Sequence, residues 1–181
     1  MNKNKTYFTQ KEDEDFNKLV HFNNNFLNGE IERNKPCDWL DAHGTLPDNR
    51  ECNIELKGRE FRLEQNKFGE WQFINESGYT CTTIFCEANK VSELLFQLLY
   101  NGGQPLYINF TINDYILVFN LAKLSSIPDM RVEFVKNKGY GYTAEKCYRY
   151  HLPITDATIY KRDGNNYELI KKGDGCNRKD C

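Results

Sequence analysis

The sequence predicts an α/β fold in which helices flank a mixed central sheet. Apolar residues recur at helical spacing over residues 9–32 and again over 89–100, whereas residues 51–63 alternate with period two. Nearly unbroken apolar runs over 106–112 and 115–121 add two covered strands. The expected order is helix, three strands, helix and two strands. With 181 residues, 39% hydrophobic and 14% aromatic, the chain suits one domain with a packed core.

The first helix is expected over residues 9–32. Thr9 and Glu12 match a capping box at its start, and Gly29 leaves its end open. Glu30 continues the apolar stripe at helical spacing, so we expect it on the buried side of this helix. That stripe is Phe16, Leu19, Val20, Phe22, Phe26 and Leu27.

Short extended segments are expected next. Residues 37–42 (CDWLDA) have strand character, and residues 43–50 contain the Gly, Pro, Asp and Asn of a turn. Residues 51–63 form an alternating strand, 64–78 a connection, and 79–86 a β-branched and aromatic strand. One face of the alternating strand carries Asn53, Glu55, Lys57 and Arg59, and the other carries Cys52, Ile54 and Leu56.

The second helix, over residues 89–100, is stopped by Asn101-Gly102-Gly103, and a hairpin then turns at Asn113-Asp114. The C-terminal third is less regular, with further strands expected at 131–135 and 149–162. The whole chain, 1–181, is therefore interpreted as a single domain. Its parts are a core over 9–122, a C-terminal β extension over 123–172 and a frayed tail over 173–181.

Composition excludes several classes of protein. No apolar run approaches the roughly 20 residues of a membrane span, and the polar N-terminus is no secretory signal, so we expect a cytoplasmic protein without a membrane partner. The net charge of -2 does not provide the excess positive charge with which a protein coats nucleic acid. The seven cysteines are odd in number and lack a CxxC pair, which favours reduced structural thiols. A zinc site from Cys147, Cys176, Cys181 and His151 is a weaker alternative.

Glu55-Leu56-Lys57 is the pattern with the clearest chemistry. Residues two apart in a strand share a face, so the carboxylate and the ammonium lie on one side. Asp38 begins the preceding candidate strand and would lie beside Glu55 if the two strands pair. Converging carboxylates form an oxygen-ligand site for Mg²⁺ or Mn²⁺. The plainer interpretation is an amphipathic strand with a solvated charged face.

The segment CDWLDAHG…NIELKGR resembles the core of the PD-(D/E)XK nuclease superfamily, in which an acid on one strand is followed by an ExK strand. The resemblance covers residues 12–121 and implies a restriction endonuclease-like sheet in the order α-β-β-β-α-β-β, with additional C-terminal strands. Asp38 would be the first acid. Asp41 is the alternative that would point to the opposite strand face, and Asp48, of the literal Pro47-Asp48, falls in the turn.

The resemblance implies a Mg²⁺-dependent nuclease that hydrolyses phosphodiester bonds in DNA. Asp38, Glu55 and Glu30 would be the metal ligands, with Mn²⁺ as the substitute ion. Lys57 would act on the attacking water or on the charge of the phosphate.

Other implied properties are less specific. Lys90 and Arg59 are weaker candidates for substrate binding, with an ordinary exposed side chain as the alternative for each. The expected partner is DNA, the resemblance adds a homodimer, and no organic cofactor is expected. A stand-alone nuclease from a phage or mobile element would suit the small size. The rival functions are a non-catalytic nucleic-acid- or protein-binding domain with the same fold, and a nuclease acting on RNA.

Overall fold

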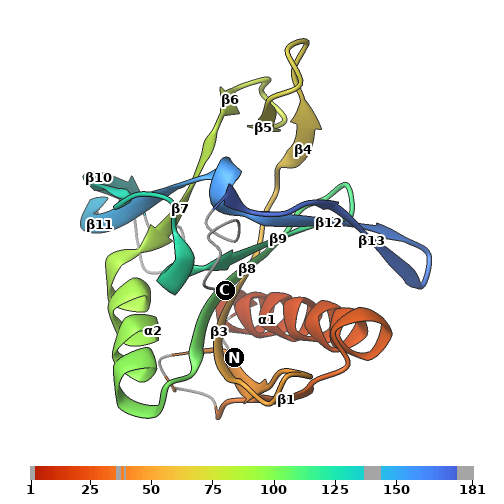
Figure 1. Cartoon of the computed structure of the whole chain (residues 1–181). Helices are drawn as coiled ribbons and strands as arrows, with labels where there is room; N and C mark the ends of the chain where they lie inside the picture. Colours follow the sequence, from red (N-terminus) through yellow and green to blue (C-terminus); the bar gives the residue numbers. More distant parts are fainter. Residues whose placement is uncertain (1–2, 36–37, 39, 137–143, 175–181) are drawn as a thin grey trace.

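The computed structural model describes residues 3–35, 38, 40–136 and 144–174 (Figure 1). Within these residues, no helix combines the length and the apolar character that crossing a membrane requires. In chain order the elements are α1 (Lys3–Phe22), the π-helical η1 (Asn23–Leu27), β1 (Glu30–Arg33), β2 (Ala42–Thr45), β3 (Glu51–Gly58), β4 (Arg62–Gln65), β5 (Trp71–Ile74), β6 (Thr80–Cys81), β7 (Thr83–Glu87), α2 (Ala88–Asn101), β8 (Gln104–Phe110), β9 (Tyr115–Asn120), the 3₁₀-helical η2 (Leu121–Lys123), β10 (Asp129–Lys136), β11 (Ala144–Pro153), the 3₁₀-helical η3 (Ile154–Asp156), β12 (Thr158–Asp163) and β13 (Asn166–Lys171).

Across the described residues, the central sheet has seven strands in the order β1-β2-β3-β8-β9-β12-β13. β3 and β8 run parallel, with Glu55 opposite Tyr107, and the connection between them passes through α2. β2 pairs with β3, and β9 with β8 and β12, in antiparallel register. This is the mixed α/β class that the sequence predicts, and it is consistent with a restriction endonuclease-like fold. The C-terminal strands β12 and β13 extend the same sheet.

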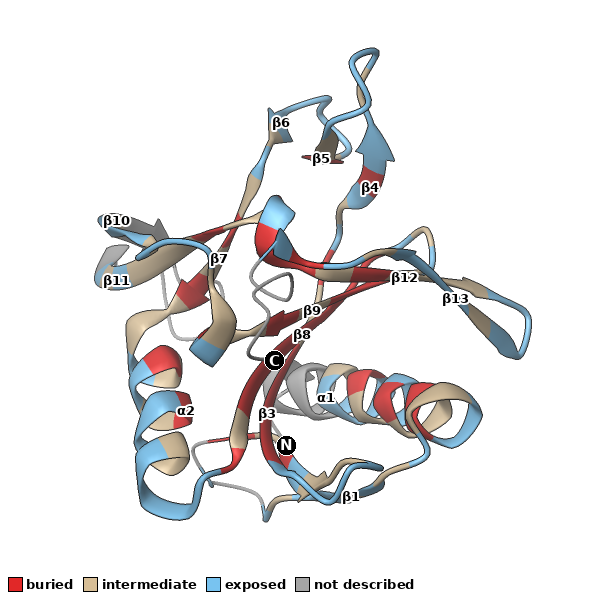
Figure 2. Cartoon of the chain, viewed as in Figure 1, coloured by how far each residue is buried: buried red, intermediate tan, exposed pale blue. Residues whose placement is uncertain are grey.

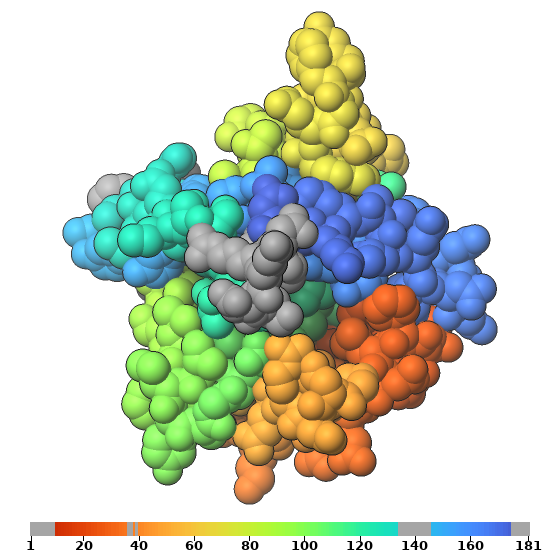
Figure 3. All heavy atoms as spheres, in the orientation of Figure 1, coloured from red at the N-terminus to blue at the C-terminus, as the bar shows by residue number. Residues whose placement is uncertain are grey.

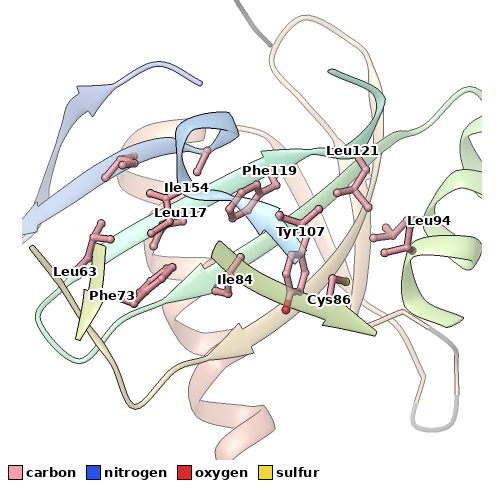
Figure 4. Close-up of a cluster of buried hydrophobic side chains, with 14 of the residues drawn as sticks. Leu63, Phe73, Ile84, Cys86, Leu94, Tyr107, Leu117, Phe119, Leu121 and Ile154 are labelled. Carbon is pink, nitrogen blue, oxygen red and sulfur yellow. The ribbon is translucent and has the colours of Figure 1, made fainter. Parts of the chain in front are cut away.

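The helices α1 and α2 cover opposite faces of this sheet (Figure 1). Leu19 and Phe22 of α1 pack on the even-numbered side chains of β3 and β8. Leu94 of α2 packs on the other face, in the cluster around Tyr107 and Phe119 (Figure 4). β3 is therefore buried on both faces (Figure 2), and the polar side chains in its middle are shielded from solvent.

Smaller sheets lie at the ends of the core. β10, β11 and β7 form one sheet beside α2, and β7 leads directly into that helix. β4, β5 and β6 form another that projects from the body of the molecule (Figures 1 and 3). Leu63 and Phe73 anchor this projecting sheet because both are buried in the core cluster beside α2.

The first helix differs from the prediction at both ends. It begins at Lys3, so Thr9 and Glu12 lie inside it and form no capping box. Its last turn is π-helical and ends at Asn28, which has a φ of 54°. The side chain of Asn23 accepts from the backbone N–H of Gly29 at 2.9 Å and donates to its carbonyl at 2.7 Å. These bonds close the helix, and the chain turns away into β1.

The next segments are shifted in register. The strand predicted over 37–42 is wrong for the described residues 38, 40 and 41, because β2 begins only at Ala42 and continues to Thr45. The turn lies at residues 46–49 rather than 43–50. The long strand over 51–63 is divided into β3 and β4, and the connection over 64–78 contains β5. The second helix and the hairpin after it are confirmed.

The predicted strand positions of Cys52, Cys81 and Cys86 are confirmed, and these thiols are free, as is that of Cys147. Burial raises the pKa of Cys52 to about 11 and that of Cys86 to about 12, so both are poor nucleophiles. Cys37, Cys176 and Cys181 lie outside the described residues, and so does the zinc site that would need the last two.

Candidate active site

The C-terminal half of β3 carries a buried carboxylate between two lysines. Glu55 is 2% exposed and faces the side of the sheet covered by α2. The Nζ atom of Lys90, near the start of α2, lies 3.0 Å from its Oε2, and the Nζ atom of Lys57 lies 3.7 Å from its Oε1. The side chains of Lys57 and Lys90 are 40% and 20% exposed. Charged groups of both signs therefore meet where the buried strand reaches solvent.

Asp41 supplies a second carboxylate beside β3. Its backbone N–H donates to the carbonyl of Ile54 at 3.1 Å, directly before β2 begins. Its Oδ2 accepts from the backbone N–H of Leu56 at 2.7 Å. The side chain thus continues the hydrogen bonding of β3 beyond the end of β2. This geometry holds Asp41 next to Glu55.

The electrostatic environment of Glu55 opposes its ionisation. Burial raises the pKa of Glu55 to about 7, and the nearby charge of Asp41 adds to the rise. Lys57 and Lys90 act in the opposite direction but do not outweigh burial. A buried carboxylate with a raised pKa beside a second carboxylate is typical of a site that operates on a cation or a proton.

The middle of α1 closes the other side of this site. Asp15 is buried and its Oδ2 accepts from the backbone N–H of Gly58 at 2.7 Å, which ties the helix to the end of β3. A Cβ at Gly58 would lie 2.5 Å from the Asp15 carboxylate, so the close approach requires glycine. Lys11 and Glu12, a turn earlier on α1, also face the site. We call the enclosed space of about 300 Å³ the Glu55 cavity; it is lined by Lys11, Glu12, Asp15, Phe16, Arg33, Asp41, Glu55, Leu56, Lys57, Gly58, Arg59 and Lys90.

Asp38 and Glu30 are not brought to the Glu55 cavity. Asp38 is exposed, and its Oδ2 accepts from the backbone N–H of Lys35 at 3.0 Å, closing a local turn. It lines a different cavity, together with Asn53 and residues of α2. Glu30 is exposed on β1, where it pairs with Thr45.

The structure places Asp41 rather than Asp38 beside Glu55, whereas strand alternation from residue 37 onward predicts the reverse. β2 begins at Ala42, so Asp41 is not a strand residue and alternation does not set its direction. Likewise, Glu30 was assigned to a helix that ends before it. Glu12 is the glutamate that α1 presents to the site. Its spacing from Asp15 and Leu19, i to i+3 and i+7, was the signal that could have found it.

Of the weaker candidates, Lys90 is brought to Glu55, whereas Arg59 has a different environment from the one expected. Arg59 is 8% exposed and donates to Oδ1 of Asn109 at 2.9 Å and to the carbonyl of Phe85 at 2.8 Å. It also donates to the hydroxyl of Tyr107. An ordinary exposed arginine is excluded, and the guanidinium is committed to bonds inside the protein.

The donor set has the chemistry of a hard divalent cation site. Among the described residues, no three His, Cys, Asp or Glu side chains come together as a metal-binding group. Mg²⁺ does not need such a cage, because it keeps several waters and binds through one or two carboxylates plus substrate phosphates. Burial is the main cause of the raised pKa of Glu55, and a cation between Asp41 and Glu55 would stabilise the charged form of both carboxylates. The residues present therefore fit Mg²⁺ or Mn²⁺.

The sequence matches no protein family profile and no curated protein. Among solved structures, the chain is similar to Hjc, a Holliday junction resolvase from Archaeoglobus fulgidus, with 12% identity and a TM-score of 0.37. The similarity covers 67% of this chain and 68% of that protein. Similarity at this level establishes neither a family nor an activity for the chain.

Proposed function

We propose that this protein is a metal-dependent nuclease that hydrolyses phosphodiester bonds in DNA. The observation that carries the proposal is the convergence of Asp41, Glu55, Lys57 and Lys90 at the solvent-accessible end of a buried strand. This revises the ligand set expected from the PD-(D/E)XK resemblance, with Asp41 in place of Asp38 and without Glu30.

Asp41 and Glu55 would hold Mg²⁺ or Mn²⁺. When bound, such an ion lowers the pKa of a coordinated water and stabilises negative charge on a phosphate oxygen. Lys90, whose Nζ lies 3.0 Å from Oε2 of Glu55, would share that carboxylate with such an ion.

The lysines would act on the substrate. Lys57 is the more exposed of the two and lies on the same strand face as Glu55, so it would orient the attacking water or neutralise the charge that develops on the phosphate. Lys90 approaches from α2 and would bind a phosphate oxygen from the other side of Glu55. Glu12, which lines the cavity from α1, would accept a hydrogen bond from a water there.

The test is cleavage of linear, nicked, branched and single-stranded DNA in Mg²⁺ and in Mn²⁺ by the wild type, Glu55→Gln and Lys57→Ala. We expect metal-dependent cutting that both variants lose. Cutting that survives in both variants would reject this site. RNA of the same sequences tests the rival substrate class.

Metal binding can be measured without activity. Mg²⁺ should raise the melting temperature of the wild type and leave that of Glu55→Gln unchanged, because a ligand that binds the folded state stabilises it. Glu51→Gln is a matched control, since Glu51 is an exposed glutamate at the other end of β3. Equal shifts in wild type and Glu55→Gln would remove Glu55 from the metal site.

A non-catalytic DNA-binding domain is the second candidate. The observation that favours it is that Glu55 is already ion-paired with both lysines. The absence of cutting and of a metal-induced melting shift, with DNA binding retained, would support this alternative.

A further inference from the structure

A second cavity continues from the Glu55 cavity toward the projecting sheet of β4, β5 and β6. It is an open, groove-like space with a volume of about 500 Å³. The two cavities share Lys11, Gly58 and Arg59 as lining residues. A chain-like substrate that occupies the Glu55 cavity can therefore continue into this second space. We call it the β5–β6 turn cavity, because residues 75–77 form its far wall.

The far wall of this cavity is held in place by its own hydrogen bonds. The Oδ1 atom of Asn75 accepts from the Ser77 hydroxyl at 2.7 Å and from the backbone N–H of Tyr79 at 2.9 Å. The backbone N–H of Gly78 donates to the Asn75 carbonyl at 3.0 Å, and Gly78 has a φ of 79°. The turn is thus preorganised before any ligand enters.

The chemistry of the lining favours a neutral nucleobase over a phosphate. Glu60 and Glu76 balance the charges of Lys11 and Arg59, so the lining of the β5–β6 turn cavity offers no excess positive charge to a phosphodiester. Carboxylates accept hydrogen bonds from the amino groups on base edges, as Glu and Asp do from cytosine. Phe61, a half-buried lining residue, supplies an apolar surface for the ring.

The lysine side chains are concentrated in the Glu55 cavity rather than in the β5–β6 turn cavity. Lys57 and Lys90 lie in the Glu55 cavity, and Lys11 lies where the two cavities meet, with its Nζ 3.4 Å from Oε1 of Glu60. The charge of Lys11 is offset by Glu60, so a phosphate is favoured at the reaction centre beside Lys57 and Lys90, and a neutral base is favoured beyond the junction. A paired base cannot enter, because its edge is occupied and extrusion from the duplex costs free energy.

We infer that the β5–β6 turn cavity binds the unpaired base of the nucleotide next to the scissile phosphate, so that the substrate is DNA with a single-stranded segment at the cut. This inference rests on the proposed nuclease function. Under this inference the projecting sheet selects the substrate, and the metal-binding carboxylates do not.

The experiment compares a splayed-arm DNA with a fully paired duplex of the same sequence, and then with a splayed arm that lacks the base beside the mapped cut. We expect the wild type to prefer the intact splayed arm, and loss of the base to lower kcat/KM about tenfold, the scale of one base contact. Equal cutting of the intact and abasic arms by the wild type would overturn the inference while leaving the nuclease in place.

Ser77→Leu fills the cavity from its far wall, and Ser126→Leu is the matched control at an exposed serine outside both cavities. We expect Ser77→Leu to cut the intact arm about tenfold more slowly and to be insensitive to removal of the base. Ser126→Leu should retain the wild-type ratio. A Ser77→Leu protein that melts like the wild type and retains base sensitivity would also overturn the inference.

If the wild type cuts no DNA, the proposed function fails. The base-binding cavity can then be tested on its own by measuring the binding of a single-stranded oligonucleotide. Fluorescence anisotropy of a labelled single-stranded oligonucleotide would then be measured for the wild type and Ser77→Leu. Weaker binding to the variant and to the abasic oligonucleotide supports a base-binding cavity. Equal binding in all combinations overturns it.

Discussion

Glu55 on β3 and Glu133 on β10 each have two basic neighbours, yet their pKa values shift in opposite directions. Glu133 has Nη1 of Arg149 at 2.8 Å and Nε2 of His151 at 2.9 Å. Burial raises the pKa of Glu133, but the hydrogen bonds from these neighbours more than offset it, and the pKa lies below its ordinary value. The pKa of Glu55 is raised to about 7 despite Lys57 and Lys90.

The difference comes from burial and from the second acid. The Glu133 side chain is 33% exposed, whereas that of Glu55 is 2% exposed. Asp41 lies close to Glu55 and raises its pKa further. The two neighbours of Glu133 thus stabilise its charged form, whereas the buried carboxylate of Glu55, with Asp41 beside it, would be stabilised further by a bound cation. Function is expected where the local electrostatics cost stability.

The largest expected effect concerns which aspartate completes the Glu55 cluster. Asp41→Asn should lower metal-dependent cleavage about a thousandfold, because it removes a metal ligand. Asp38→Asn is the matched control, since Asp38 lies in a different cavity. Single-turnover cleavage measures both. Loss of activity in Asp38→Asn with retention in Asp41→Asn would reverse the assignment.

The next effect is the pH dependence of stability. The pKa of Glu55 is 4.5 when unfolded and about 7 when folded, so its contribution is fully present below about 4.5 and is lost as the pH rises through 7. The difference corresponds to about 3 kcal/mol in the free energy of unfolding. In metal-free buffer, Glu55→Gln should therefore become more stable than the wild type as the pH rises from 5 to 8. Urea unfolding at each pH measures the difference, and parallel curves would contradict it.

A smaller effect is expected from Lys90. Its charge lowers the pKa of Glu55, so Lys90→Met should raise that pKa further and move the acid limb of the pH–rate profile upward. We expect cleavage to fall about tenfold at pH 7 and to recover partly at higher pH. Lys67→Met removes an exposed lysine from the projecting sheet and should leave the profile unchanged. An unaltered profile in Lys90→Met would separate Lys90 from the site.

The smallest expected effect concerns the cluster of Glu133, Arg149 and His151. Glu133→Gln removes the charge from the hydrogen bonds to Arg149 and His151 and should lower the free energy of unfolding by about 1 kcal/mol at pH 7, with no change in cleavage. The pKa of Glu133 is depressed, so its contribution is present above the unfolded value and lost as the pH falls through the folded one. The difference from wild type should therefore shrink below about pH 4.5. A loss of activity would show that the two clusters are coupled.

The sequence by itself determined the α/β class, the second helix, the hairpin after it, and the pairing of Glu55 with Lys57. These features depend on local periodicity, and residues two apart in a strand share a face whatever surrounds them.

Only the tertiary structure decided which acid lies beside Glu55. Asp41 is held there by the backbone N–H of Leu56, which it reaches because β2 begins one residue later. Likewise, Glu30 lies outside the helix, because the hydrogen bonds between the Asn23 side chain and the backbone of Gly29 end the helix before it. Such hydrogen bonds depend on contacts that form only in the folded protein, so the periodicity of the sequence does not predict them.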